Sequence, residues 1–243
     1  MAPLTGQYIL VIGGSSGIGF SVAKLALAGG AKVAIASSSA DKVNNAVSRL
    51  DGKASGHTVD LSAVDPEAAI EKLLADVTVS GKLDHIINTA GRGLPKPIAK
   101  LDLASANELA RLPLFVPLFL GKLGPKYLKE GYNSSIILTS GQIAEKPAPG
   151  YSVLSAFVSS QHALARNLAV DLAPRRVNVV APGPTETEMW GASAEFLRGF
   201  VSKQNLLGKP GQPDEVAEAY IYLMKNTDAT GSVVSTNGGI ILK

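Results

Sequence analysis

The stretch that decides the fold is YILVI at residues 8–12 followed directly by GGSSGIG at residues 13–19. The first five residues form the short apolar run of a buried strand, and a helical pattern begins at Ile18. Glycines make the turn tight and let backbone approach a pyrophosphate, whose charge the free N–H groups of the helix favour. This strand–turn–helix context predicts a dinucleotide site on Gly13, Ser15, Ser16, Gly17, Ile18 and Gly19. The alternative is a turn that only connects strand and helix.

The rest of the chain alternates short apolar runs with longer helical patterns. Further strands are expected at 32–36, 56–59, 83–87, 135–138, 176–180 and 232–235. Helices are expected at 18–29, 41–50, 66–77, within 105–129, at 155–172 and at 213–225. Alternating elements of this kind predict βαβ units. With no linker or repeat, we expect one α/β domain over 1–243, a Rossmann-type doubly wound parallel sheet.

The amino-acid composition argues against several classes of function. The 243 residues are 46% hydrophobic and contain no cysteine and three scattered histidines, so we expect no disulfide and no metal site. The net charge of +3 is small and spread out, which argues against a nucleic-acid partner and suits an anionic cofactor. No apolar stretch reaches the length of a membrane span, so we expect no membrane association and a cytoplasmic location.

Several motifs together resemble the short-chain dehydrogenase/reductase family. The spacing G-x-x-x-G-x-G is that family's, and Asp60-Leu61 resembles its adenine-binding pair. The blocks 88–91 (NTAG), 182–183 (PG) with Thr187, and 236–239 (TNGG) resemble its remaining signatures. The resemblance implies a Rossmann fold and a nicotinamide cofactor. It also implies that Asp60, Leu61, Asn88, Ala90, Gly91, Pro182, Gly183 and Thr187 contact that cofactor.

The second predicted strand ends in Ser37-Ser38-Ser39, where an NAD-specific site usually carries an acid for the ribose 2′-hydroxyl. No acid occurs until Asp41. Three hydroxyls with Lys42 nearby favour a 2′-phosphate, so we expect NADP(H). The alternative is a plain serine-rich helix N-cap.

The catalytic end departs from the family pattern. The resemblance implies a Ser, a Tyr and a Lys, and Ser140 stands where the family has its Ser. Tyr151 resembles the catalytic Tyr, but Ser155 stands four residues later in place of Lys. Counting back from 164–169 (LARNLA), which resembles the family's L-T-R-x-L-A, puts Leu154 at the Tyr position and Val158 at the Lys position. We therefore expect Ser140 and Tyr151 to position the substrate without the usual proton relay.

The helix within 105–129 carries two prolines. The best match puts Pro113 where the family has an Asn, and Pro117 follows, so we expect a kinked or broken helix that either reshapes the substrate pocket or only shapes the surface. Many members of the family pair through this helix and the one at 155–172. We expect a homo-oligomer, with Phe157 and His162 facing the seam, although the prolines could spoil it.

Without a positioned acid, reduction of a plain ketone typically loses ~10²–10⁴ in rate, whereas an iminium ion needs no proton. Residues 146–153 (KPAPGYSV) resemble the P-D-P-G-W segment of degenerate fungal short-chain proteins, some of which reduce iminium intermediates and guide a Diels–Alder cyclisation. Ala148 stands in place of their Asp. We expect an NADP(H)-dependent oxidoreductase of secondary metabolism that reduces an activated C=N or C=C in a small molecule. The rivals are a cyclase on this scaffold and a non-catalytic nucleotide-binding protein. Expected substrate contacts are Arg92, Gln142, Met189 and Trp190.

Overall fold

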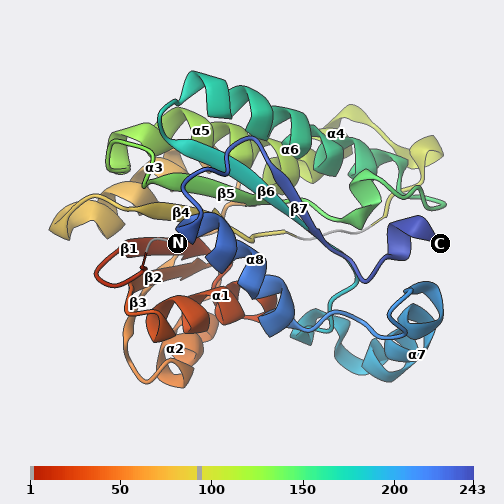
Figure 1. Ribbon diagram of the computed structural model, residues 1–243. Helices are drawn as coiled ribbons and strands as arrows, with labels where there is room; N and C mark the ends of the chain where they lie inside the picture. Colours follow the sequence, from red (N-terminus) through yellow and green to blue (C-terminus); the bar gives the residue numbers. More distant parts are fainter. Residues whose placement is uncertain (1–2, 92–94) are drawn as a thin grey trace.

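A computed structural model describes residues 3–91 and 95–243. Within these residues, seven parallel strands form one sheet in the order β3-β2-β1-β4-β5-β6-β7 (Figure 1). The strands are β1 Tyr8–Ile12, β2 Lys32–Ser37, β3 Ala54–Thr58, β4 His85–Asn88, β5 Ser135–Thr139, β6 Arg176–Pro182 and β7 Val233–Thr236. The predicted fold class, a Rossmann-type doubly wound sheet, is confirmed.

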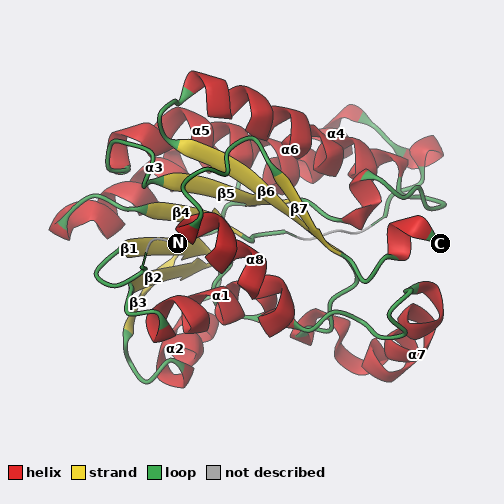
Figure 2. Cartoon of the chain, in the orientation of Figure 1, coloured by secondary structure: helices red, strands yellow, loops and turns green. Residues whose placement is uncertain are grey.

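Helices cover both faces of the sheet (Figure 2). One layer contains α1 Gly17–Ala28, α2 Ala40–Arg49 and α8 Pro213–Lys225; the other contains α3 Pro66–Val77, α4 Leu103–Ala110, α5 Val116–Tyr127 and α6 Ser152–Asp171. Alternate residues of β1 divide between the two cores: Ile9 and Val11 pack with α1 and α8, and Leu10 and Ile12 with α3 and α5. This two-sided burial explains why the strands read as continuous apolar runs.

Two features differ from the sequence prediction. The helix α7, Ala194–Gln204, was not expected; it lies apart from both layers at the lower right of Figure 1. Helix α6 begins at Ser152, three residues earlier than predicted, because Tyr151 acts as its N-cap residue. The expected interruption around Pro113 is confirmed: the helix continues from α4 to α5 through a π-helical turn, Arg111–Phe115. A wider turn of this kind accommodates a residue that lacks a backbone N–H.

This run, Leu103–Tyr127, is the one stretch of the described chain that is long and apolar enough to span a membrane by length and composition. Its most apolar window has a mean hydropathy of 1.2, and 22% of that window is buried. The run belongs to the layer that packs on the sheet, where Val116 and Leu120 are fully buried. Leu103 and Leu118 of this run are exposed, whereas Leu112, Phe119 and Leu123 pack against the core.

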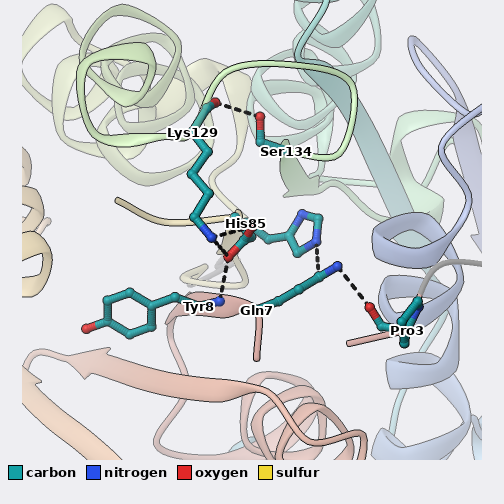
Figure 3. Close-up of polar contacts among 7 residues, drawn as sticks. Pro3, Gln7, Tyr8, His85, Lys129 and Ser134 are labelled. Carbon is teal, nitrogen blue, oxygen red and sulfur yellow. Dashed lines mark hydrogen bonds and ion pairs between the residues drawn. The ribbon is translucent and has the colours of Figure 1, made fainter. Parts of the chain in front are cut away.

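A polar network fixes the amino end of β4, opposite the carboxyl edge of the sheet (Figure 3). His85 is fully buried between the Ser135 hydroxyl and the Gln7 side-chain oxygen, each 2.8 Å from a ring nitrogen. Asp84 accepts hydrogen bonds from the Tyr8 backbone N–H at 2.7 Å and from the Lys129 ammonium at 2.8 Å. Burial lowers the pKa of His85 to about 3, so the ring is neutral at pH 7.

Candidate active site

The predicted cofactor contacts lie at one edge of the sheet. Strands β1, β2, β4, β5 and β6 end at Ile12, Ser37, Asn88, Thr139 and Pro182, and the predicted contacts stand at or just after these ends. Since all strands run parallel, their carboxyl ends share one edge. The order reverses between β1 and β4, which makes the crevice there the expected place for a ligand in an open α/β sheet.

The glycine turn is packed too closely for a side chain at Gly13, Gly14 and Gly19. A Cβ on Gly13 would lie 2.7 Å from the Thr89 hydroxyl and 2.8 Å from the Ala90 nitrogen. A Cβ on Gly19 would strike the Gly13 carbonyl oxygen and the same Thr89 hydroxyl. The turn after β1 therefore lies directly against the N-T-A-G block after β4. This is the cradle that a dinucleotide requires, so the residues present fit the cofactor.

The N-terminus of α1 already attracts an anion from within the chain. The side chain of its N-cap residue, Ser16, makes no capping hydrogen bond. The Gly17 N–H instead donates to the Glu188 carboxylate at 2.9 Å. Glu188 also lies 3.9 Å from the Arg49 guanidinium, which stacks over the Phe20 ring. Sequence analysis missed Glu188 and Arg49, because only the folded chain brings them to the glycine turn.

These residues line an open cavity of about 780 Å³ between α1 and the segment after β6. A Cβ on Gly17 would lie 3.0 Å from Thr187, so that segment rests on the glycine turn. Gly183 is equally confined, because its Cβ would lie 2.7 Å from the Asn237 Cα. The structure thus places Thr187 against Gly17, and Gly183 against Asn237.

The serines after β2 have distinct partners. Ser37 receives a hydrogen bond from Ser15 at 2.8 Å, which joins the strand end to the glycine turn. Ser39 is the N-cap of α2 and accepts a hydrogen bond from the Lys42 N–H. This is the helix cap that the sequence left open as the alternative for the serines. Ser38 is exposed. Asp60 accepts two hydrogen bonds from Ser62, which hold the pKa of its carboxyl below the usual range.

Buried contacts fix the carboxyl ends of β4 and β5, the two strands at the centre of the site. Leu61 is buried in the core beside α3, and Asn88 is 2% exposed, with its side-chain oxygen 3.3 Å from the Ala90 nitrogen. Thr139 donates to the Asn88 carbonyl at 2.6 Å and pairs with the buried Tyr220 hydroxyl. The ends of β4 and β5 are therefore fixed relative to each other, one residue before Ser140.

Ser140 has a partner that the sequence did not reveal. Its backbone N–H donates to the Val180 carbonyl at 2.9 Å, and its hydroxyl lies 2.8 Å from Nε2 of His162. Sequence analysis placed His162 on an oligomer seam, whereas the structure turns its ring toward Ser140. Burial lowers the pKa of His162, with a smaller opposing effect of Glu145. The helical spacing could have indicated this contact. His162 lies one turn beyond Val158 and two turns beyond Leu154, on the same side of the helix.

Tyr151 lies half-buried just before α6 and not within it. Its backbone accepts from the Ser155 N–H and donates to the Ala148 carbonyl. Helix α6 contains neither a tyrosine nor a lysine, and Leu154 and Val158 are both half-buried. Two hydroxyls of this helix, Ser155 and Ser159, bind the Ile143 and Ala144 carbonyls at 2.8 and 3.1 Å.

The expected substrate contacts are dispersed. The Gln142 side-chain oxygen is buried without a partner in the described part of the chain, two residues beyond Ser140. Met189 is 73% exposed and Trp190 half-buried, both in a short 3₁₀ helix before α7. Arg92 lies outside the described residues. Within residues 3–91 and 95–243, no cluster of three potential ligands is arranged to hold a metal ion.

Comparisons agree with this geometry. A family model described as an SDR-like Rossmann domain matches residues 2–243, so the chain belongs to the short-chain dehydrogenase/reductase family. It is 44% identical to the short-chain dehydrogenase/reductase ATR9 of Stachybotrys chlorohalonatus over 100% of both chains.

Two solved structures extend the comparison. The MalC reductase/Diels–Alderase from Malbranchea aurantiaca superimposes with a TM-score of 0.94 at 35% identity, covering 99% of this chain and 98% of that one. A small-chain dehydrogenase in complex with NADPH gives a TM-score of 0.81 at 27% identity, covering 98% and 100%. The family supports an oxidoreductase role, and the fungal relatives suggest secondary metabolism.

Proposed function

We propose that this protein is an NADP(H)-dependent oxidoreductase that reduces an activated C=N or C=C bond of a small molecule without the usual Tyr–Lys relay. One observation carries the proposal: the glycine cradle is intact, yet the adjacent helix α6 carries no lysine, and the nearest tyrosine, Tyr151, precedes it. Bound NADPH supplies hydride. The fungal relatives support a role in secondary metabolism, and we propose a cytoplasmic location.

The residues of the chain have distinct tasks in this proposal. In this proposal the cradle on Gly13 and Gly19 receives the pyrophosphate, and Ser37 and Ser38, at the end of β2, bind the 2′-phosphate. Ser140, at the end of β5, orients the substrate, and the half-buried Tyr151 provides an aromatic wall. An unassisted tyrosine is a weak acid, with a pKa of about 10, which favours a substrate that already carries positive charge.

A second candidate function is a cyclase on the same scaffold. It is supported by the likeness to the MalC reductase/Diels–Alderase over nearly the whole chain. A cyclisation would use the shape of the pocket and consume no NADPH. A non-catalytic nucleotide-binding protein would bind NADPH and transform nothing.

One experiment separates the three. The purified protein is incubated with NADPH, then with NADH, and a panel of iminium ions, imines and enones, and absorbance at 340 nm is followed with product analysis. We expect NADPH to be consumed and to be preferred over NADH. Gly19→Asp, checked by circular dichroism for folding, should bind neither cofactor. Product formation without NADPH consumption would favour the cyclase, and no conversion of any compound would favour the binding protein.

We also propose a homo-oligomer. The outer surface of the α4–α5 run supports this, because Leu103 is 78% and Leu118 41% exposed on a helix of high apolarity. Burying such residues against a second copy removes apolar surface from water.

A further inference from the structure

The substrate-facing hydroxyl of Ser140 is connected to a titratable ring. Its Oγ lies 2.8 Å from Nε2 of His162, well within hydrogen-bonding distance. The Ser140 backbone is fixed by the Val180 carbonyl, and His162 sits in the middle of the long helix α6. Both groups are half-buried, so the pair is partly accessible and partly shielded from water.

The helix face that carries His162 is attached to the segment after β5. Ser155, Ser159 and His162 occupy positions i, i+4 and i+7, which lie on one side of a helix. The two serines bind the Ile143 and Ala144 carbonyls, and His162 reaches Ser140. Three consecutive turns thus hold the ring in place. Such positioning is what a group needs to act in proton transfer.

We propose that Ser140 and His162 together form a proton donor to the substrate, so that this site also reduces neutral activated C=O and C=N bonds. The inference rests on the proposed reductase function. In the step, hydride supplied by bound NADPH would add to the carbonyl carbon, leaving NADP⁺, and the π electrons would move to oxygen. That oxygen takes the proton of Ser140 Oγ, which takes a proton from Nε2 of the imidazolium. The product is an alcohol, and the neutral ring regains its proton from water.

The charges around His162 fit this task. Burial is the largest influence on its pKa and lowers it, Arg166 lowers it further, and Glu145 raises it. The elements packed against α6 carry other charged side chains, which have partners elsewhere or are exposed. Arg111 binds the Ser62 carbonyl, and Arg176 binds carbonyls of α8. Lys122 pairs with Glu67 and Lys126 with Glu71, while Glu108 is exposed. The pKa of His162 therefore lies below its ordinary value, and acid pH favours the protonated ring that can donate.

The test uses two substrates, NADPH and His162→Gln, which retains a polar group but cannot titrate. N-methylisatin is a neutral activated ketone, and N-methyl-3,4-dihydroisoquinolinium is permanently cationic and needs no proton. We expect His162→Gln to lower the ketone-to-iminium ratio of kcat/KM by about 10²–10⁴-fold. In the wild type, kcat/KM for the ketone should fall tenfold per pH unit above the pKa of His162, and this dependence should vanish in the variant. His57→Gln, on β3, is the matched control and should leave the ratio unchanged.

An unchanged ratio, or an equal loss on both substrates, would overturn the inference while leaving the reductase function in place. Failure of the wild type to reduce either compound would overturn the proposed function and this inference with it. A measurement independent of turnover is the NMR titration of the His162 C2–H, assigned with His162→Gln. Ser140→Ala should shift its midpoint, and an identical midpoint in the two proteins would contradict a shared proton.

Discussion

The Glu188 carboxylate accepts a hydrogen bond from an N–H group that would otherwise bind the pyrophosphate of the cofactor. Removing the Glu188 charge should therefore tighten cofactor binding. The carboxylate accepts from Gly17 at 2.9 Å, at the positive end of the α1 dipole. A hydrogen bond to a charged group contributes about 1.5–3 kcal/mol, and the dipole adds about 0.3–1 kcal/mol. The Glu188 side chain is 56% exposed, so solvent screening reduces the sum to about 1 kcal/mol.

The change to test is Glu188→Gln. A glutamine has the same shape but no charge, so NADPH no longer displaces an anion. A gain of about 1 kcal/mol corresponds to a Kd about fivefold lower. Isothermal titration calorimetry at 0.05 M salt measures it, and the gain should shrink at 1 M salt, where the Debye length is about 3 Å. Glu195→Gln on the exposed side of α7 changes the net charge equally and is the control.

Two results would refute the reasoning. If Glu188→Gln binds NADPH no more tightly than the wild type, the carboxylate does not compete with the cofactor. If Glu195→Gln gains as much, the effect comes from net charge alone. Arg49, 3.9 Å from Glu188, allows a further check, because Arg49→Gln should weaken NADPH binding more in the Glu188→Gln background, where the guanidinium is free to meet the cofactor.

Four other changes have defined outcomes. Tyr151→Phe should lower kcat for an iminium substrate less than tenfold, and a loss of ~10³-fold with unchanged binding would identify Tyr151 as a proton donor. Arg176→Met should cost about 4 kcal/mol in urea unfolding, because the buried guanidinium satisfies carbonyls at the end of α8; a loss under 1 kcal/mol would contradict this. His85 is neutral when folded and protonates when unfolded, so stability should fall by about 2 kcal/mol from pH 6.5 to pH 5, and His85→Gln should lose this contribution. Light scattering should give a multiple of the monomer mass that Leu118→Asp reduces; a monomeric wild type would exclude the oligomer.

The fold was predictable because most strands are apolar runs with a turn signal at their ends; β3, with the sequence ASGHT, is the exception. The glycine turn, the strand of residues 8–12 and the helix 66–77 appear in the structure with the expected bounds or within a residue of them. Helix α7 was missed because its burial is slight: Val201 is buried, while Phe196 and Phe200 are exposed and stack on each other. A helix that covers little core leaves little periodic signal in the sequence.

The site was predictable only where backbone geometry sets the residue type. Gly13 and Gly19 are recognisable in the sequence, because no side chain fits at these positions. Glu188 and His162 carry no such signal, since their roles depend on a carboxylate and a ring that reach other elements across the fold. The distances from Glu188 to Gly17 and from His162 to Ser140 are tertiary facts that no local pattern encodes.

The same distinction bears on the proposed absence of the Tyr–Lys relay, because side chains can be exchanged while the cofactor cradle stays intact. The cradle depends on contacts of backbone with backbone, so a Cβ at Gly13 or Gly19 would displace the strand end itself. Leu154 and Val158 of α6 are half-buried, so their side chains are less confined than the glycines of the turn. Exchange at these positions alters the chemistry at little expense to the fold. Because His162 follows them on the helix and already contacts Ser140, a new route for protons requires no movement of the backbone.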